Sequence, residues 1–151
     1  MRKALDPIRG EYFRCGEDIY RVDSLNRGGD EVVLYKISDL SKWSVRLSVF
    51  RHAYEQVWKI GTVAQLLERS QRTLYRYESA GKIEKAKRYP DAYGRELRFY
   101  SAGDILDMHE MVSGIHAGRP RGDGKVVNNS LPPRVEILKT LRERFGINGA
   151  R

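Results

Sequence analysis

A short segment from Ser70 to Ala80 carries side chains that can hydrogen-bond to the edges of nucleic-acid bases. Ser70 is a favourable N-cap, and Leu74 shares one face of the helix that would follow with Tyr77. Four polar or amphipathic residues, Gln71, Arg72, Tyr75 and Arg76, lie mostly on the other side of this helix. Arginine can donate two hydrogen bonds to guanine, and glutamine can pair with adenine in the same bidentate way. We therefore expect a helix over residues 70–80 that can present base-reading side chains to the major groove of DNA.

A run of cations follows this helix and surrounds a turn signal. Pro90 to Gly94 forms the expected tip of a hairpin, and Arg95 to Tyr100 its return strand. The cations on the two sides of the tip are Lys82, Lys85, Lys87, Arg88, Arg95 and Arg98. Basic hairpins of this kind commonly hold phosphates beside the groove that a helix reads.

The distribution of charge points to the same segment. The chain of 151 residues has a formal net charge of +8 and a pI of about 9.7. Residues 59–100 carry 10 basic and 5 acidic side chains, whereas residues 1–58 carry 10 and 9, and residues 101–151 carry 8 and 6. A basic domain with a local excess of cations is typical of nucleic-acid binders, so an anionic partner is expected over the central segment.

The order of motifs along this segment is also informative. The motifs are Thr62-Val63-Ala64, then Ser70-x-Arg72-Thr73-Leu74-x-x-Tyr77-Glu78-x-x-Gly81-x-Ile83, then Arg98-x-Tyr100-Ser101-x-x-Asp104-Ile105. Together they resemble the DNA-binding domain of the mercury-resistance regulator (MerR) family, and they are similar to that of excisionases and some phage terminase small subunits. The resemblance implies a winged helix-turn-helix roughly between Lys59 and Met108, with Thr62 as an N-cap of its first helix.

The resemblance also implies DNA contacts. In the family, the positions of Arg72 and Tyr77 usually touch the DNA backbone, and an Arg-x-Tyr pair ends the wing, as Arg98 and Tyr100 do here. Where the family commonly has tyrosine, this chain has Arg76. The residues expected to bind DNA are Thr62, Ser70, Gln71, Arg72, Thr73, Tyr75, Arg76, Tyr77, Lys85, Lys87, Arg88, Arg95, Arg98, Tyr100, Arg119 and Arg121.

Two departures from the family limit what can be carried over. Glu68-Arg69 stands where the family often has glycine and an apolar residue, so the turn between the two helices is expected to differ. The family's regulators continue into a long dimerisation helix and an effector domain, but here the third helix meets Gly114. We therefore expect neither ligand sensing nor dimerisation by the family's usual route.

Arg119 and Arg121 belong to a second, shorter motif. Gly118-Arg119-Pro120 resembles the core of an AT-hook, in which an extended Arg-Pro backbone enters a narrow minor groove. The same residues suit a flexible basic linker equally well. Both interpretations stay open at this point.

The remaining segments complete the expected fold. Val45, Leu47 and Val49 alternate with polar residues in the run from Trp43 to Phe50, which is typical of a strand with one buried face. The fold class expected is α+β: a small β-rich domain, either a curled sheet or an SH3-like barrel, followed by the MerR-like winged helix-turn-helix and a short C-terminal helix. The expected boundaries are a tail over 1–10, the β-rich domain over 11–57, the winged helix-turn-helix over 58–115, a basic linker over 116–132 and the amphipathic helix over 133–146.

Two helices should carry apolar stripes. The stripe of the third helix, capped by Ser101, comprises Ile105, Met108, Met111 and Val112. The stripe of the C-terminal helix, opened by Pro133, comprises Val135, Leu138, Leu141 and Phe145. Trp43 and Trp58 are expected in the core, although either could anchor a protein partner if exposed.

Catalysis is not expected. Cys15 is the single cysteine, expected as a half-buried strand residue, and the three histidines, His52, His109 and His116, form no metal-ligand pair. No catalytic residue, metal or cofactor is therefore predicted. The chain has no apolar run long enough to cross a membrane and its first residues lack a secretory signal, so a cytoplasmic location follows by default.

The expected function is sequence-preferring binding of double-stranded DNA by a bacterial or phage-encoded transcriptional regulator. One alternative is an excisionase or terminase small subunit that positions DNA for a recombinase or packaging motor. Another is an adaptor that docks on RNA polymerase, another large protein or a second copy through residues 11–57 or the C-terminal helix. The target sequence, the oligomeric state and the direction of regulation stay open.

Overall fold

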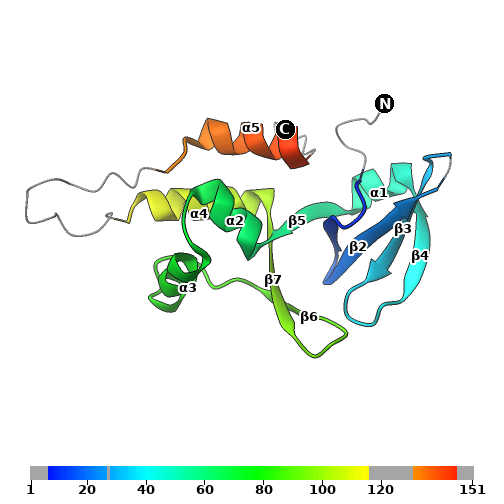
Figure 1. Cartoon of the computed structure of the whole chain (residues 1–151), viewed down its shortest axis with the longest axis horizontal. Coiled ribbons are helices and arrows are strands. Elements are labelled where there is room, and N and C mark those ends of the chain that lie inside the picture. The colour runs from blue at the N-terminus through cyan, green and yellow to red at the C-terminus, as the bar shows by residue number, and fades with distance from the viewer. Residues whose placement is uncertain (1–6, 27, 116–130, 146–151) are drawn as a thin grey trace, which may run out of the picture.

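The computed structural model describes residues 7–26, 28–115 and 131–145 (Figure 1). Its elements, in chain order, are β1 (Tyr12–Cys15), β2 (Asp18–Leu25), β3 (Glu31–Lys36), β4 (Lys42–Arg46), α1 (Leu47–Ala53), β5 (Glu55–Lys59), α2 (Ile60–Leu67), α3 (Gln71–Ser79), β6 (Arg88–Pro90), β7 (Glu96–Ser101), α4 (Ala102–Ser113) and α5 (Arg134–Phe145).

One antiparallel sheet organises the described part of the chain. It has seven strands in the order β4-β3-β2-β1-β5-β7-β6. Strand β5 links the N-terminal strands to the β6–β7 hairpin, because it pairs with β1 on one side (Tyr12 opposite Val57) and with β7 on the other (Trp58 opposite Tyr100). Strand β7 then pairs with β6 through its first residues, where Leu97 lies opposite Tyr89.

The expected fold class is therefore wrong. A small β-rich domain followed by a separate winged helix-turn-helix would need a break in pairing near residue 57, but β5 spans residues 55–59 and is hydrogen-bonded on both sides. The protein has a strand-dominated fold around a single curled sheet, and the predicted wing is the last hairpin of that sheet. Long-range pairing between β1 and β5, which local sequence patterns do not reveal, decides this arrangement.

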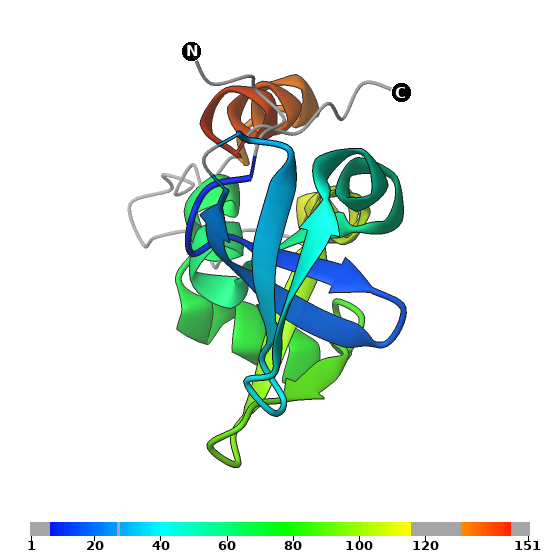
Figure 2. The same cartoon turned by 90° about the vertical axis from the view of Figure 1, so that its right-hand side faces the viewer.

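The curl of the sheet encloses a small core that joins the hairpin to the N-terminal strands. Its buried residues are Ile19, Ile37, Val57, Tyr89 and Phe99. At the lower edge of the molecule, the turn after β3 lies beside the hairpin tip, and the amide of Ala92 donates a 2.8 Å hydrogen bond to the carbonyl of Ile37 (Figure 2). The hairpin is thus tied to the N-terminal strands at its tip as well as at its base.

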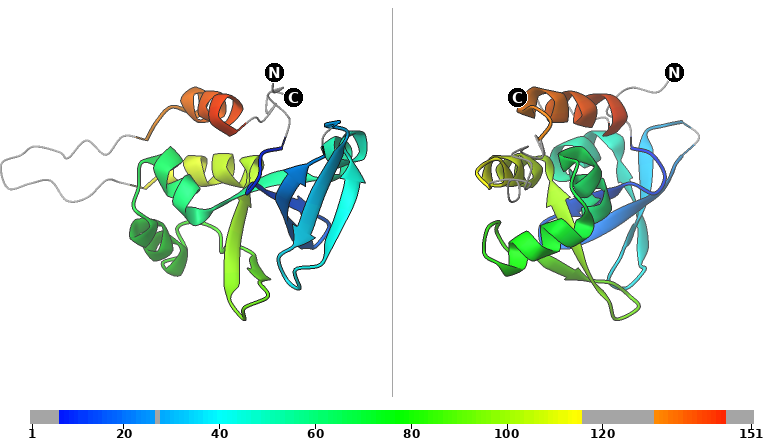
Figure 3. Two further views of the ribbon diagram at one scale, coloured as in Figure 1. Left: turned by 45° about the vertical axis from the view of Figure 1, so that its right-hand side comes forward. Right: turned by 60° about the vertical axis from the view of Figure 1, so that its left-hand side comes forward.

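A second core lies where helices α2, α3, α4 and α5 pack beside β5 and β7. Its most deeply buried members are Val63, Leu67, Leu74, Ile105, Ile137 and Leu141. Trp58 is buried here as expected, at 6% exposure. In both views of Figure 3, α5 lies on the opposite side of α2 and α4 from α3, so α5 leaves the outer face of α3 uncovered.

The third core joins β1–β4 to α1 and corrects two expectations. Alternation predicted a strand through Trp43–Phe50, but the strand ends at Arg46 and a short helix buries Phe50 instead. Val49 is consequently 51% exposed rather than buried, and Trp43, expected in the core, is 38% exposed on the edge strand β4. In the helix, the buried Phe50 ring packs edge-on against Phe13 at a centroid distance of 4.6 Å, a long-range contact that the local alternation does not reveal.

The two helices after β7 follow their expected apolar stripes only in part. Ser101 caps α4, as predicted, and forms a capping box with Asp104. Of the predicted stripe, Ile105, Met108 and Val112 are buried. Met111, expected in the stripe, is 38% exposed. In α5, Leu141 is buried as expected, but Val135 is 75% exposed and Ile137 takes its place in the core.

Two further expectations can be placed. Cys15 is half-buried in β1, as predicted. The Gly118-Arg119-Pro120 motif and Arg121 lie outside the described residues. Within the described ranges, none of the helices combines the length and apolar character needed to cross a bilayer.

Candidate nucleic-acid interface

Helix α3 has the boundaries that the sequence predicted. The Ser70 hydroxyl oxygen accepts a 3.1 Å hydrogen bond from the Thr73 amide and lies 2.8 Å from the Thr73 hydroxyl, so both side chains are engaged in the cap. At the other end, Gly81 has φ of +73° and the Lys82 amide donates to the Tyr77 carbonyl. Between the caps, Leu74 is 1% exposed and anchors the inner face of the helix in the core.

The outer face of α3 carries the predicted base-reading side chains. Gln71, Arg72 and Arg76 are exposed, and Tyr75 is half-buried beside them. We call these four residues the α3 face. Ser79, also exposed, follows Arg72 by seven residues and lies on the same stripe of the helix, although it was not predicted. Its spacing from Arg72 was the signal that could have included it.

The start of α2 differs from the prediction. Thr62 is not the N-cap: α2 begins at Ile60 after Lys59, and no side chain caps it. The helix starts early because β5 stays paired with β7 as far as Lys59 and leads straight into it. Thr62 is therefore a half-buried residue inside the first turn of α2.

The turn between α2 and α3 is short and closed by a residue in an unusual conformation. Glu68 ends α2 with φ of 51° and ψ of 43°, the left-handed region that suits glycine. The Arg69 amide then donates to the Ala64 carbonyl at 3.0 Å. This turn brings Gln71 beside the start of α2. The Gln71 Nε2 atom lies so near Gly61 that a Cβ atom added to this glycine would be 3.2 Å from it.

Glu78, on the inner side of α3, binds the hairpin and the loop that precedes it. Its Oε1 accepts a 3.1 Å hydrogen bond from Arg98 and lies 3.8 Å from a terminal nitrogen of Arg88, and its Oε2 accepts from the Ala86 amide at 3.2 Å. The Arg98 guanidinium also lies under the Tyr75 ring, 4.5 Å from its centroid. Arg88 and Arg98, both expected to bind DNA, are thus held by a carboxylate of the protein itself.

The other predicted cations differ in their exposure and in whether they pair with a carboxylate of the protein. Lys85 is exposed in the loop after α3. Lys87 forms an ion pair with Glu17, from the turn between β1 and β2, and this hydrogen bond raises the pKa of Lys87 above its usual value and lowers that of Glu17. Arg95 is largely exposed at the hairpin tip, although its Nε donates to Asp91 at 2.9 Å.

Asp91 gives the hairpin tip a defined shape. Its Oδ1 accepts hydrogen bonds from the amides of Tyr93 (2.9 Å) and Arg95 (2.8 Å), and its own amide donates to the Arg95 carbonyl. Burial raises the pKa of Asp91, but these amide hydrogen bonds and the Arg95 guanidinium outweigh burial and leave the pKa below its usual value. The tip holds Tyr93 outward at 72% exposure.

Two predicted tyrosines belong to the core more than to the surface. Tyr100 is 5% exposed among the residues beneath α2 and α4, and burial raises its pKa to about 12. Tyr77 is half-buried against the same core, with the Lys82 ammonium 5.9 Å from its ring centroid. Both tyrosines thus pack mainly against the core rather than on the α3 face.

Helix α3, the loop after it and the β6–β7 hairpin form one edge of the molecule, and the α3 face, Lys85 and Arg95 belong to these elements. In Figure 1, α3 and the β6–β7 hairpin both lie below α2 and α4, while α5 lies above them. This edge is basic, with Arg72 and Arg76 exposed on the helix. Such an arrangement can place one helix in a groove and a second element on the phosphates beside it.

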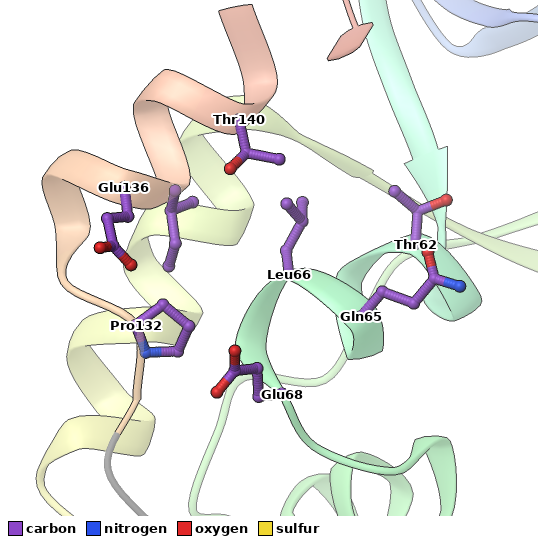
Figure 4. Close-up of a pocket in the computed structure, with 8 residues that line it drawn as sticks. Thr62, Gln65, Leu66, Glu68, Pro132, Glu136 and Thr140 are labelled. Atoms are coloured by element: carbon purple, nitrogen blue, oxygen red, sulfur yellow. The ribbon is translucent and has the colours of Figure 1, made fainter. Parts of the chain in front are cut away.

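A cavity of about 200 Å³ lies away from this edge, between α2 and α5 (Figure 4). Thr62, Gln65 and Leu66 line it from α2, and Glu136 and Thr140 from α5. Thr62, expected to bind DNA, thus borders the seam between two helices. No group of three or more histidine, cysteine or acidic side chains placed to hold a metal ion occurs among the residues that the structure describes.

Comparison with known proteins found no match to a family model, to a curated protein or to a solved structure. The resemblance of the central motifs to the mercury-resistance regulators therefore stays a prediction.

Proposed function

We propose that this protein binds double-stranded DNA, with the α3 face in the major groove and the hairpin on the adjacent backbone. The observation that carries the proposal is the pairing of two exposed arginines, Arg72 and Arg76, with a buried anchor, Leu74, on the opposite side of the same capped helix. A helix with these properties can enter the groove without losing its own core contacts.

The surroundings of α3 supply the contacts that such binding needs. Gln71, Arg72 and Arg76 offer hydrogen-bond donors to base edges, and Lys85 and Arg95 offer charge to phosphates on either side of the hairpin turn. Because phosphate binding releases counterions, the affinity should fall steeply with salt concentration.

The biological setting that fits best is transcriptional regulation in the bacterial cytoplasm or nucleoid. DNA binding of this kind also serves excisionases and terminase small subunits, which the central motifs equally resemble. Mapping the sites occupied on native DNA separates these settings, since promoters favour regulation and an attachment or packaging site favours DNA positioning.

The test begins with a target selected from a random DNA pool by the unchanged protein. Arg72→Ala combined with Arg76→Ala should then weaken binding to that target by about 30-fold or more, because each base contact contributes about 1–3 kcal/mol and the double variant removes two. Arg9→Ala combined with Arg46→Ala, which removes two exposed cations from the N-terminal part, is the control of equal charge. Equal affinities of the two double variants in mobility-shift titrations would show that α3 does not read DNA.

A second activity, docking of a protein partner, is favoured by the surface around β4. Leu40 in the turn before β4 is 44% exposed, Trp43 in β4 is 38% exposed and Val49 in α1 is 51% exposed. Exposed tryptophan is a common anchor of protein interfaces. Recovery of a specific partner by the full-length protein, lost in Trp43→Ala, would support this role; identical recoveries would remove it.

A further inference from the structure

Glu78 lies where helix α3, the loop after it and the β6–β7 hairpin meet. Its side chain is 8% exposed, so the carboxylate is largely withdrawn from solvent. One oxygen binds Arg98 of β7 and lies near Arg88 of β6, and the other accepts the Ala86 amide of the loop. A single buried carboxylate therefore joins the element that would read bases to the element that would hold phosphates.

We propose that Glu78 is a positioning residue for DNA recognition: it fixes the angle between α3 and the hairpin so that both can engage one duplex together. This inference deepens the proposed function and depends on it. Glu78 itself faces the protein and would touch no DNA.

The contacts of Arg98 extend the effect of Glu78 to the α3 face. The Arg98 guanidinium stands between the Glu78 carboxylate and the Tyr75 ring, and its buried Nε has no hydrogen-bond partner among the described residues. Among the residues that the structure describes, Glu78 is the carboxylate that forms an ion pair with Arg98. Removal of the carboxylate would release Arg98 from beneath Tyr75 and so disturb a residue of the α3 face directly.

Charge neutralisation is the alternative role that the experiment must separate from positioning. Glu78 cancels charge on Arg88 and Arg98, so its removal makes the edge more basic and should raise affinity for any DNA. Loss of positioning should instead lower affinity for the target relative to random DNA. The ratio of the two affinities therefore reports positioning, whereas a fall in the folded fraction would lower both affinities equally.

The first measurement needs no DNA. Spin labels are attached through Ala80→Cys at the end of α3 and Ala92→Cys at the hairpin tip, in a Cys15→Ser background. We expect a narrow distance distribution for the unchanged Glu78, a broad or shifted one for Glu78→Ala, and no change for Glu96→Ala, which removes an exposed carboxylate of the hairpin. An unaltered distribution in Glu78→Ala would overturn the inference.

The second measurement compares the selected target with random duplex DNA. Glu78→Ala should lower the ratio of the two affinities about tenfold, the cost of about one base contact, while its affinity for random DNA is kept or rises. Glu78→Gln keeps one carbonyl oxygen, which can accept from Arg98 or from the Ala86 amide but not from both, so it should recover only part of the ratio. Glu96→Ala should leave the ratio unchanged.

The outcomes separate the two proposals. An unchanged ratio in Glu78→Ala, or equal losses on both DNAs, would overturn the inference alone, because the unchanged protein would still discriminate its target. Absence of DNA binding by the unchanged protein would overturn the proposed function, and the role of Glu78 in recognition with it.

Discussion

Burial of the Tyr100 ring gives its hydroxyl group an unusual titration. The pKa of Tyr100 is about 12, against an ordinary value of 10.0, because the core disfavours the charged phenolate. The folded state thus holds the proton more tightly than the unfolded chain does. The contribution of Tyr100 to stability is intact below pH 10 and is lost as the pH rises from 10 to 12.

Substitution of Tyr100 tests its place in the molecule. Tyr100→Phe should leave DNA affinity within about twofold and should reduce the loss of stability between pH 10 and 12, measured by thermal unfolding. Tyr100→Ala should lower the free energy of unfolding by about 3–5 kcal/mol, since it leaves a cavity beneath α2 and α4. A Tyr100→Phe protein that folds normally but binds DNA tenfold more weakly would return this hydroxyl to the interface.

The pKa of Asp91 is shifted in the opposite direction, so its effect on stability is expected at acid pH. Its folded pKa lies below the usual 3.8, so its contribution to stability is present above that value and is lost as the pH falls through the folded pKa. Asp91→Asn should therefore lower the melting temperature at pH 7, and the gap from the unchanged protein should narrow steadily below pH 4. A gap that is the same at pH 7 and pH 2.5 would rule out the charged carboxylate as the group that orders the tip.

At the scale of elements, the α2–α3 turn stores a small amount of backbone strain. Glu68 has φ of 51°, where a side chain is disfavoured. Glu68→Gly should raise the free energy of unfolding by about 0.5–1 kcal/mol in urea denaturation. Ala80→Gly, at the end of α3 with φ of −84°, should lower it by a similar amount because only flexibility is gained. The same sign for both variants would contradict the strain at Glu68.

Elements with local signals were predictable from the sequence. Ser70 and Gly81 mark the two ends of α3, and Ser101 with Asp104 marks the start of α4. These signals are local, because caps act through hydrogen bonds to residues a few positions away. Helix α1 was missed because residues 44–49 alternate in polarity as a strand would. The helix buries Phe50 in a core that includes Phe13, far earlier in the chain, and local alternation does not reveal such contacts.

The candidate site was predictable on the outer face of α3 and less so on the hairpin. Arg72 and Arg76 were placed correctly because helical spacing alone decides which side faces away from Leu74. The pairing of Arg98 with Glu78 joins residues 20 positions apart and leaves no mark in a list of charges. In the sequence, such cations resemble free surface charges. In the fold, two of them, Arg88 and Arg98, pair with Glu78.

At the scale of the whole molecule, the continuous sheet predicts a single cooperative unfolding transition. Trp43 reports on β4, and Trp58 reports on β5 beside α2 and α4. Trp43→Phe and Trp58→Phe each retain one tryptophan. Within each variant, the urea midpoint measured by tryptophan fluorescence should equal the midpoint measured by circular dichroism. Separate fluorescence and circular-dichroism midpoints within one variant would indicate two domains after all.

The hydrogen bond from Ala92 to Ile37 has a consequence for the proposed complex with DNA. Because the hairpin tip is hydrogen-bonded to the β3–β4 turn, the surface around Trp43 would point in one fixed direction around the axis of the bound duplex. A partner seated there would face a DNA-bound neighbour only when the two sites lie in matching helical phase. Insertion of about 5 base pairs between the sites would turn the partner to the far side, and about 10 would bring it back.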